Sequence, residues 1–144
     1  MIKMVIQGEP KPLQRHRTAI VQGKTKHYDS QKKKKHFTSC QMLAEKKNGN
    51  WLFDETPKPS KNGYALTVKF YMYRPPAMNK FSEERLNQTP HTQKPDIDNL
   101  LKYIFDCGNK ILWYDDAEVC AIENVVKCWS HIPRTEIIIN ELVY

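Results

Sequence analysis

The pattern of apolar and polar positions along the chain predicts strands and helices in alternation. Residues 64–73 form the clearest predicted strand, because apolar and β-favouring residues alternate there with a period of two. Residues 1–8 show the same alternation and are predicted to form the first strand. Two further strands are predicted near the C-terminus, over residues 118–127 and 134–143, on either side of a turn at 130–133.

A first helix is predicted from about residue 30 to residue 47. Asp29 and Ser30 are suited to cap its N-terminus, and an Asn-Gly-Asn sequence at 48–50 ends it. Apolar residues recur within it at helical spacing and should define its buried face. These residues are Phe37, Cys40, Leu43 and Ala44.

A second helix is predicted after Pro95, which disfavours helical structure in the residue before it. Asp98 or Asn99 is the expected N-terminal cap, and Gly108 marks the expected end. An apolar stripe at helical spacing supports this helix. The stripe comprises Leu100, Leu101, Ile104 and Phe105.

The order of these elements predicts an α/β chain of the α+β type. We expect one domain over residues 1–144, in which a mixed sheet of about four strands packs against two main helices. Residues 19–26 have little pattern and are expected to form a short strand or an arm. Residues 74–93 are polar, and we expect them to form a mobile loop beside the second helix, with a short helix at 82–86.

Charge is distributed unevenly along the chain, whose formal net charge is +7. Residues 1–93 contain 18 Lys and Arg against 7 Asp and Glu, whereas residues 94–144 contain 5 against 9. A basic surface attracts phosphates, so the first part suits a DNA-binding protein. The alternative is a lysine-rich surface without a specific partner. The residues expected to contact DNA are Arg15, Arg17, Lys24 and Lys94.

Composition excludes several classes of protein. No apolar run approaches the length of a membrane span, and no secretory signal pattern is present, so a soluble cytoplasmic protein is expected. The four cysteines form no C-x-x-C pair, which argues against a zinc site. We expect all four to be half-buried, with Cys120 and Cys128 on one face of a strand.

Five carboxylates lie within about twenty residues of this otherwise basic chain. On the second helix Asp98, Lys102 and Asp106 share one face, because they are four residues apart. Two carboxylates 4 Å apart repel by roughly 4 kcal/mol at an effective dielectric of 20, so converging carboxylates need a cation. Mg²⁺ or Mn²⁺ is the expected ion. Each acid also has an ordinary alternative: a helix cap, a solvated loop, a turn, or an ion pair between Asp106 and Lys102.

The acids form part of two motifs that resemble a known family. Lys94-Pro-Asp-Ile-Asp-Asn-Leu-Leu-Lys102, followed by Asp106, Asp115-Asp-Ala-Glu-Val119 and Lys127, resembles the RusA-type Holliday junction resolvases. These are small, dimeric, Mg²⁺-dependent endodeoxyribonucleases, often carried by phages and prophages. A Gly-x-Pro segment followed by basic residues also follows the first strand in many relatives, as it does here at 8–17.

The resemblance implies roles for particular residues. The metal-binding and catalytic acids map to Asp96, Asp98 and Asp116, and the catalytic lysine of the motif maps to Lys102. Asp106 and Asp115 would support the site. One departure is Glu118, which stands where Gln is common in the family.

Together these features predict a Mg²⁺-dependent endonuclease, with Mn²⁺ as the alternative ion, that resolves four-way DNA junctions in recombination and repair. Its setting would be the cytoplasm of a bacterium or of a phage-infected host. The alternatives are a nuclease for other branched or flapped DNA and a non-catalytic DNA-binding protein whose acids are structural. His91, near the acids, is expected to be an exposed loop residue rather than a metal ligand.

A four-way junction is approximately two-fold symmetric and needs two cuts, so a homodimer is expected. The candidate interface residues are exposed aromatic side chains, and each has core packing as its alternative. They are Phe81, Trp129 and Tyr144.

Overall fold

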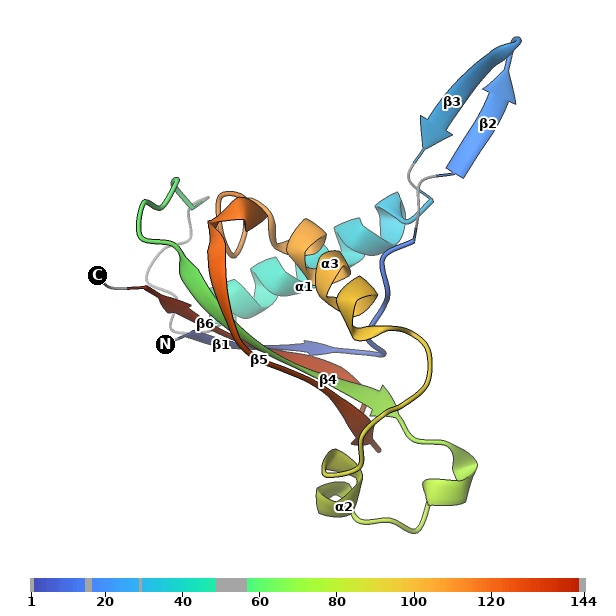
Figure 1. Ribbon diagram of the computed structural model, residues 1–144, viewed down its shortest axis with the longest axis vertical. Helices are drawn as coiled ribbons and strands as arrows, with labels where there is room; N and C mark the ends of the chain where they lie inside the picture. Colours follow the sequence, from blue (N-terminus) through green and yellow to red (C-terminus); the bar gives the residue numbers. More distant parts are fainter. Residues whose placement is uncertain (1, 15–16, 29, 49–56, 143–144) are drawn as a thin grey trace.

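A four-stranded sheet forms the frame of the molecule (Figure 1). The computed structural model describes residues 2–14, 17–28, 30–48 and 57–142. The strands are β1 (Ile2–Gln7), β2 (Arg17–Val21), β3 (Lys24–Tyr28), β4 (Tyr64–Tyr73), β5 (Val119–Ser130) and β6 (Arg134–Glu141). The helices are α1 (Lys32–Asn48), α2 (Glu83–Asn87) and α3 (Ile97–Gly108), with two 3₁₀ turns, η1 (Pro76–Met78) and η2 (Asp116–Glu118).

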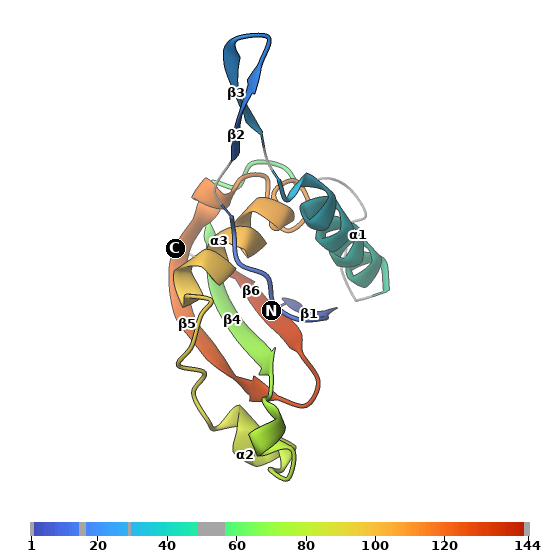
Figure 2. The ribbon, with the colours of Figure 1, turned by 90° about the vertical axis from the view of Figure 1, so that its right-hand side faces the viewer.

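The main sheet has the order β1-β6-β4-β5 and is mixed. β4 and β5 are parallel, whereas β6 is antiparallel to both β1 and β4. Both α1 and α3 lie on one side of this sheet, and α2 lies beyond its end (Figures 1 and 2). The predicted α+β class, with about four strands and two main helices, is therefore confirmed.

The central strand β4 has the bounds that its sequence predicts. One of its faces is fully buried and consists of Leu66, Val68, Phe70 and Met72. The other face is less apolar, with Thr67 and Lys69 only half-buried. The alternation with period two therefore placed the core side of the sheet correctly.

The helix α3 packs its apolar side against the sheet and against α1. Its buried side chains include Leu100, Tyr103, Ile104 and Cys107. The helix begins two or three residues earlier than predicted, because the N-cap is Asp96 rather than Asp98 or Asn99. The Asp96 carboxylate makes no capping hydrogen bond and accepts one from Lys94 Nζ at 2.9 Å instead.

The buried side of α1 differs from the predicted one. Phe37 is 62% exposed, and the other residues of the predicted apolar face, Cys40, Leu43 and Ala44, are exposed as well. The buried residues are instead Thr38, Met42 and Lys46.

Polar contacts with the neighbouring elements explain this inversion. The Thr38 and Tyr103 hydroxyls are 3.0 Å apart, and Lys46 Nζ donates to the Ile111 carbonyl at 3.0 Å. Ser39 Oγ donates to the Cys107 carbonyl, also at 3.0 Å. The interface between α1 and α3 therefore uses hydroxyl and amino groups, which a hydropathy pattern does not record as buried.

The four cysteines differ in their exposure to solvent. Cys107 and Cys128 are buried, whereas Cys40 and Cys120 are exposed, so the expectation that all four are half-buried was wrong. Cys120 does not share a face with Cys128, because the register between β4 and β5 shifts after Tyr64 and again after Leu66. Each shift inserts an extra residue in β5 and interrupts the alternation of its side chains.

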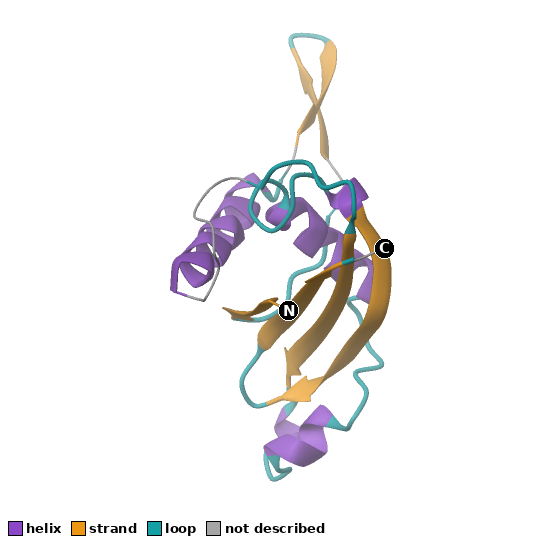
Figure 3. Ribbon diagram, turned by 90° about the vertical axis from the view of Figure 1, so that its left-hand side faces the viewer, coloured by secondary structure: helices purple, strands orange, loops and turns teal. Residues whose placement is uncertain are grey.

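The strands β2 and β3 form a separate two-stranded hairpin that projects from the body of the molecule. Figure 3 shows it extending beyond the layer of strands and helices. Its turn residues Gln22 and Gly23 have φ of +51° and +73°, as the two central positions of a type I′ hairpin turn require. The segment expected to be a strand or an arm is therefore a hairpin arm. Across the described residues, every helix is too short or too polar to cross a bilayer.

Candidate active site

The acids of the first motif lie at the start of α3. Asp96 is the N-cap and Asp98 lies in the first turn. Both side chains are exposed, and each faces an exposed lysine. Lys94 Nζ is 2.9 Å from Asp96 Oδ2, and Lys102 Nζ is 3.9 Å from Asp98 Oδ2. The lysine charges therefore balance these carboxylates through solvent-exposed pairs, which are weak and easily exchanged for another cation.

Lys127 on β5 fixes the segment that leads into α3. Its Nζ donates to the carbonyls of Gln93 and Pro95, each at 2.7 Å. These two bonds hold the chain directly before Asp96 against the sheet. Sequence reasoning gave Lys127 no role, because no local pattern relates a lysine on a strand to carbonyls more than thirty residues earlier.

The second motif forms a capped turn around η2. Asp115 is its N-cap and accepts a hydrogen bond from Ala117 N at 3.2 Å. Glu118 Oε1 accepts bonds from the backbone N–H groups of Tyr114 and Asp115 at 3.0 and 3.2 Å, and its Oε2 accepts one from Ser60 N. Asp115 and Glu118 therefore build the turn, and the departure at Glu118 supplies a carboxylate that the turn uses.

Asp116 is the acid that this turn leaves without a capping role. Its pKa is raised by partial burial and by the negative charges of Asp115 and Asp106. Asp106 itself is paired with Lys35 Nζ at 3.1 Å, so the suggested ion pair between Asp106 and Lys102 was wrong. A raised pKa from neighbouring carboxylates indicates a place that would favour a cation.

The acids named for the site lie near two different parts of α3. An α-helix rises about 1.5 Å per residue, so Asp98 and Asp106 lie about 12 Å apart along the axis. Asp96 and Asp98 line one groove at the start of the helix. Asp116 belongs to η2, which contacts α3, and the negative charge of Asp106 near the end of α3 acts on it. Among the residues that the structure describes, no three His, Cys, Asp or Glu side chains are close enough to hold a metal ion.

The groove beside Asp96 and Asp98 has a volume of about 660 Å³ and also contains His91. The expectation that His91 is exposed was wrong, because its side chain is 7% exposed. Its ring packs on Trp129 at 4.2 Å between centroids, and its backbone N–H donates to the Lys127 carbonyl at 3.0 Å. Burial and the nearby charge of Lys127 lower the pKa of His91, so the imidazole is neutral at pH 7.

The aromatic residues proposed for a dimer interface are mostly engaged elsewhere. Trp129 is buried beneath His91. Phe81 is half-buried and packs under the Arg85 guanidinium at 3.6 Å. Tyr144 lies outside the described residues. Trp129 was therefore a wrong candidate, and the homodimer stays a prediction.

Two of the four residues expected to bind DNA, Arg17 and Lys24, belong to the hairpin arm. Lys24 is exposed beside the hairpin turn, and Lys94 is exposed beside Asp96. Arg17 is the first residue of β2. Arg15 lies outside the described residues.

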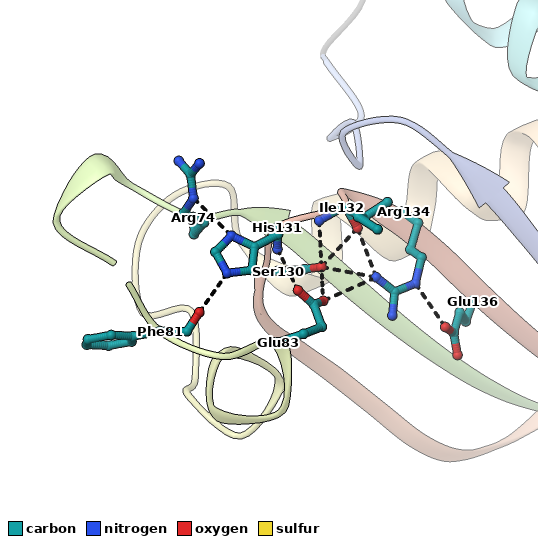
Figure 4. Close-up of polar contacts among 8 residues, drawn as sticks. All are labelled: Arg74, Phe81, Glu83, Ser130, His131, Ile132, Arg134 and Glu136. Carbon is teal, nitrogen blue, oxygen red and sulfur yellow. Dashed lines mark hydrogen bonds and ion pairs between the residues drawn. The ribbon is translucent and has the colours of Figure 1, made fainter. Parts of the chain in front are cut away.

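The far end of the sheet carries a second group of charged residues, drawn in Figure 4. Glu83 of α2 accepts hydrogen bonds from the Ser130 hydroxyl and from His131 N, the latter at 2.9 Å. Arg134 donates to Glu136 at 3.0 Å and lies 3.5 Å from Glu83. These contacts hold α2 to the turn between β5 and β6. Whether residues 74–93 are mobile stays a prediction.

Comparison with known proteins agrees with these motifs. A model of the RusA endodeoxyribonuclease family matches residues 7–140, which is nearly the whole chain. One similar protein is the uncharacterized protein YqaN of Bacillus subtilis (strain 168), 28% identical over 146 residues that cover 98% of this chain and 96% of that protein. With both acidic motifs inside the matched region, this chain belongs to the RusA endodeoxyribonuclease family.

Proposed function

We propose that this protein is a divalent-metal-dependent endonuclease that cuts four-way DNA junctions. The observation that carries the proposal is the pair of exposed carboxylates, Asp96 and Asp98, at the edge of a groove and opposed by exposed lysines. Membership of the RusA endodeoxyribonuclease family supports the same reaction class. The expected setting is recombination and repair in a bacterial cytoplasm, with the gene carried by a phage or prophage.

The chemistry of the donor set fits Mg²⁺, with Mn²⁺ as the alternative. Carboxylate oxygens are the ligands these ions prefer, and Asp96, Asp98 and Asp116 would supply them. When bound, the ion would activate water and stabilise the charge on a phosphodiester under attack. Asp115 and Glu118 would position Asp116 through the η2 turn, and Lys127 would position Asp96 through its bonds to Gln93 and Pro95.

Lys94 and Lys102 would act as exchangeable counterions. In the protein alone they balance Asp96 and Asp98 across exposed pairs. When a cation takes the carboxylates, both amino groups become available to a DNA phosphate. Lys102 would then stabilise charge at the scissile phosphate, and Lys94 would contact the backbone nearby.

A homodimer would bring the divided acids together. Within one chain Asp116 lies toward the opposite end of α3 from Asp96 and Asp98. If a two-fold dimer aligned two α3 helices in opposite directions, Asp116 of one protomer would approach Asp96 and Asp98 of its partner. Such a dimer has two complete sites related by two-fold symmetry, which matches the two cuts a four-way junction requires.

The direct test is cleavage of a synthetic four-way junction by purified Asp98→Asn protein in Mg²⁺. Cleavage should be abolished while junction binding is kept or becomes tighter, because the change removes negative charge near phosphates. Asp96→Asn and Asp116→Asn should behave alike, and Glu123→Gln, an exposed acid on β5, is the matched control. Wild-type protein that binds the junction and never cuts it would support the non-catalytic alternative. Equal cleavage of flaps would support the broader nuclease.

A further inference from the structure

The hairpin arm, defined here as residues 17–28, is fastened at its root to the acid-bearing helix. Gln31 is buried just after the arm, accepting from Gln14 N at 2.7 Å and donating to the Pro12 carbonyl at 2.8 Å. Leu13 N donates to the Asn99 carbonyl at 2.9 Å. Asn99 is the residue after Asp98, so the described segments on either side of the arm, 12–14 and Gln31, are attached beside the start of α3.

The tip of the arm presents apolar side chains to solvent. Ile20 is 79% exposed and Val21 is 43% exposed, next to the Gln22–Gly23 turn. Ile20 is opposite Thr25, and Val21 is opposite Lys24, so the two apolar residues lie on opposite faces of the ribbon. A two-stranded ribbon is marginally stable by itself. Ile20 is the most exposed of the large apolar side chains among the described residues, so it is available for contact with a partner at the tip.

The charge of the arm favours DNA as that partner. Residues 17–28 contain Arg17, Lys24 and Lys26 and no acid, and Lys32–Lys34 follow in exposed positions at the start of α1. A second copy of this basic element would be repelled by the first. A strand of five residues is about 17 Å long, and a two-stranded ribbon fits the major groove of DNA, which is about 12 Å wide.

We propose that the tip of the arm is a wedge for the branch point of DNA, with Ile20 packed against unstacked bases while the lysines contact the flanking phosphates. Proteins that bend or open DNA insert aliphatic side chains between base steps, and the cost of unstacking is lowest where pairing is already interrupted. A branch point is such a place. This inference rests on the proposed function, and it assigns to the arm the selection of branched over linear DNA.

The test compares Ile20→Ser with Ile132→Ser, a control at another exposed isoleucine in the β5–β6 turn. Dissociation constants are measured by titration, in EDTA, of a four-way junction with 2-aminopurine at the branch point and of a linear duplex of the same sequence. Ile20→Ser should weaken junction binding about tenfold, as expected from leaving one aliphatic side chain in water, and leave duplex binding unchanged. Wild-type protein should raise the 2-aminopurine fluorescence at the branch point by unstacking the bases, and Ile20→Ser should not. The control should match wild type.

Three results would overturn the wedge. The first is an unchanged affinity of Ile20→Ser for the junction. The second is an equal loss of affinity for the junction and the duplex, which would make the tip a general contact to the DNA backbone. A changed oligomeric mass in sedimentation equilibrium, which would place the arm against a second protomer, is the third. Wild-type protein with no preference for the junction would refute the proposed function itself. Intact cleavage by Ile20→Ser of a junction at saturating protein would separate the wedge from the catalytic acids.

Discussion

Two regions of this protein place carboxylates in opposite electrostatic settings. At the far end of the sheet, burial would raise the pKa of Glu83, but hydrogen bonds from Ser130 and His131 and the charge of Arg134 outweigh it and lower that pKa. At η2 the pKa of Asp116 is raised by burial and by two neighbouring acids. One region is electrostatically satisfied by the protein, whereas the other has an excess of negative charge.

This difference separates structural acids from functional ones. A carboxylate that receives several directed hydrogen bonds holds elements together, and its cation is part of the fold. A carboxylate opposed by an exposed lysine, as Asp96 and Asp98 are, can exchange that lysine for a metal ion at little cost to stability. The contrast between the two regions can therefore be tested by changing one partner at a time.

The largest expected effect comes from mixing two inactive proteins. Asp98→Asn and Asp116→Asn should each lower cleavage by about a thousandfold or more, since a catalytic metal contributes several kcal/mol to the transition state. If Asp116 acts in the partner's site, each mixed dimer regains one complete site. A 1:1 mixture after subunit exchange should then hold about one quarter of the wild-type number of sites.

The readout is nicking of a labelled junction on a denaturing gel, with each variant alone as the control. Mixed dimers have one intact site and should nick without making paired cuts. A mixture as inactive as its components would show that the three acids must come from one chain.

The next largest effect is on stability, when the cation that faces the carboxylates is removed from either region. Arg134→Ala should lower the free energy of unfolding by about 2 kcal/mol, because Glu136 loses its hydrogen-bond donor and Glu83 loses its ion pair, and because Tyr71, whose ring lies 3.8 Å from the guanidinium, is uncovered. Lys94→Ala, at a side chain that is 85% exposed, should change it by less than about 0.5 kcal/mol. Urea denaturation measures both. Equal losses would remove the distinction between the regions.

A smaller effect concerns pH. The pKa of Glu83 is lower in the folded protein than its ordinary value of 4.5, so its ionised form stabilises the fold above pH 4.5. That contribution is lost as pH falls below 4.5 through the folded pKa. Glu83→Gln should cost about 1 kcal/mol at pH 7, and the difference from wild type should shrink at lower pH. Thermal unfolding of both proteins from pH 7 to pH 3 tests this, and a constant difference would contradict it.

The smallest effect is expected at Glu118. Glu118→Gln keeps an oxygen that can accept from Tyr114 N and Asp115 N but loses the acceptor of Ser60 N, so stability should fall by less than about 1 kcal/mol and cleavage should persist. Glu118→Ala removes the acceptor and should weaken cleavage, because the turn that presents Asp116 loosens. Paired cleavage assays of the two variants distinguish the acceptor from the charge. Loss of activity in the Gln variant would mean that the charge itself takes part.

The parts of the fold that the sequence predicted are those where burial is apolar and local. β4 and α3 are examples, because apolar residues recur along each with the regular spacing of a strand or a helix and so form its core side. The buried side of α1 was mispredicted because it is attached through Thr38, Ser39 and Lys46, whose polar ends bond to α3 and to the residues after it.

The sequence predicted which residues belong to the candidate site but not where they lie relative to one another. The resemblance to the family predicted Asp96, Asp98 and Asp116, whereas the distance of Asp116 from the other two depends on how η2 meets α3. The role of Lys127 depends on strand pairing, because Lys127 reaches Gln93 and Pro95 from a different part of the chain. Every side chain of the hairpin arm whose burial is described is exposed, so only its turn residues carry a local signal.

The contacts on either side of the arm should hold the protein together even if the backbone is cut in the hairpin turn. β1 is held by its pairing with β6 and by the buried side chains of Met4 and Ile6, while Gln31 joins Pro12 and Gln14 to the start of α1. A proteolytic nick between Gln22 and Gly23 would therefore cut the backbone without releasing either piece. After such a nick the first twenty-two residues would be held by non-covalent contacts alone, so we expect that two separately made fragments would associate into the same fold.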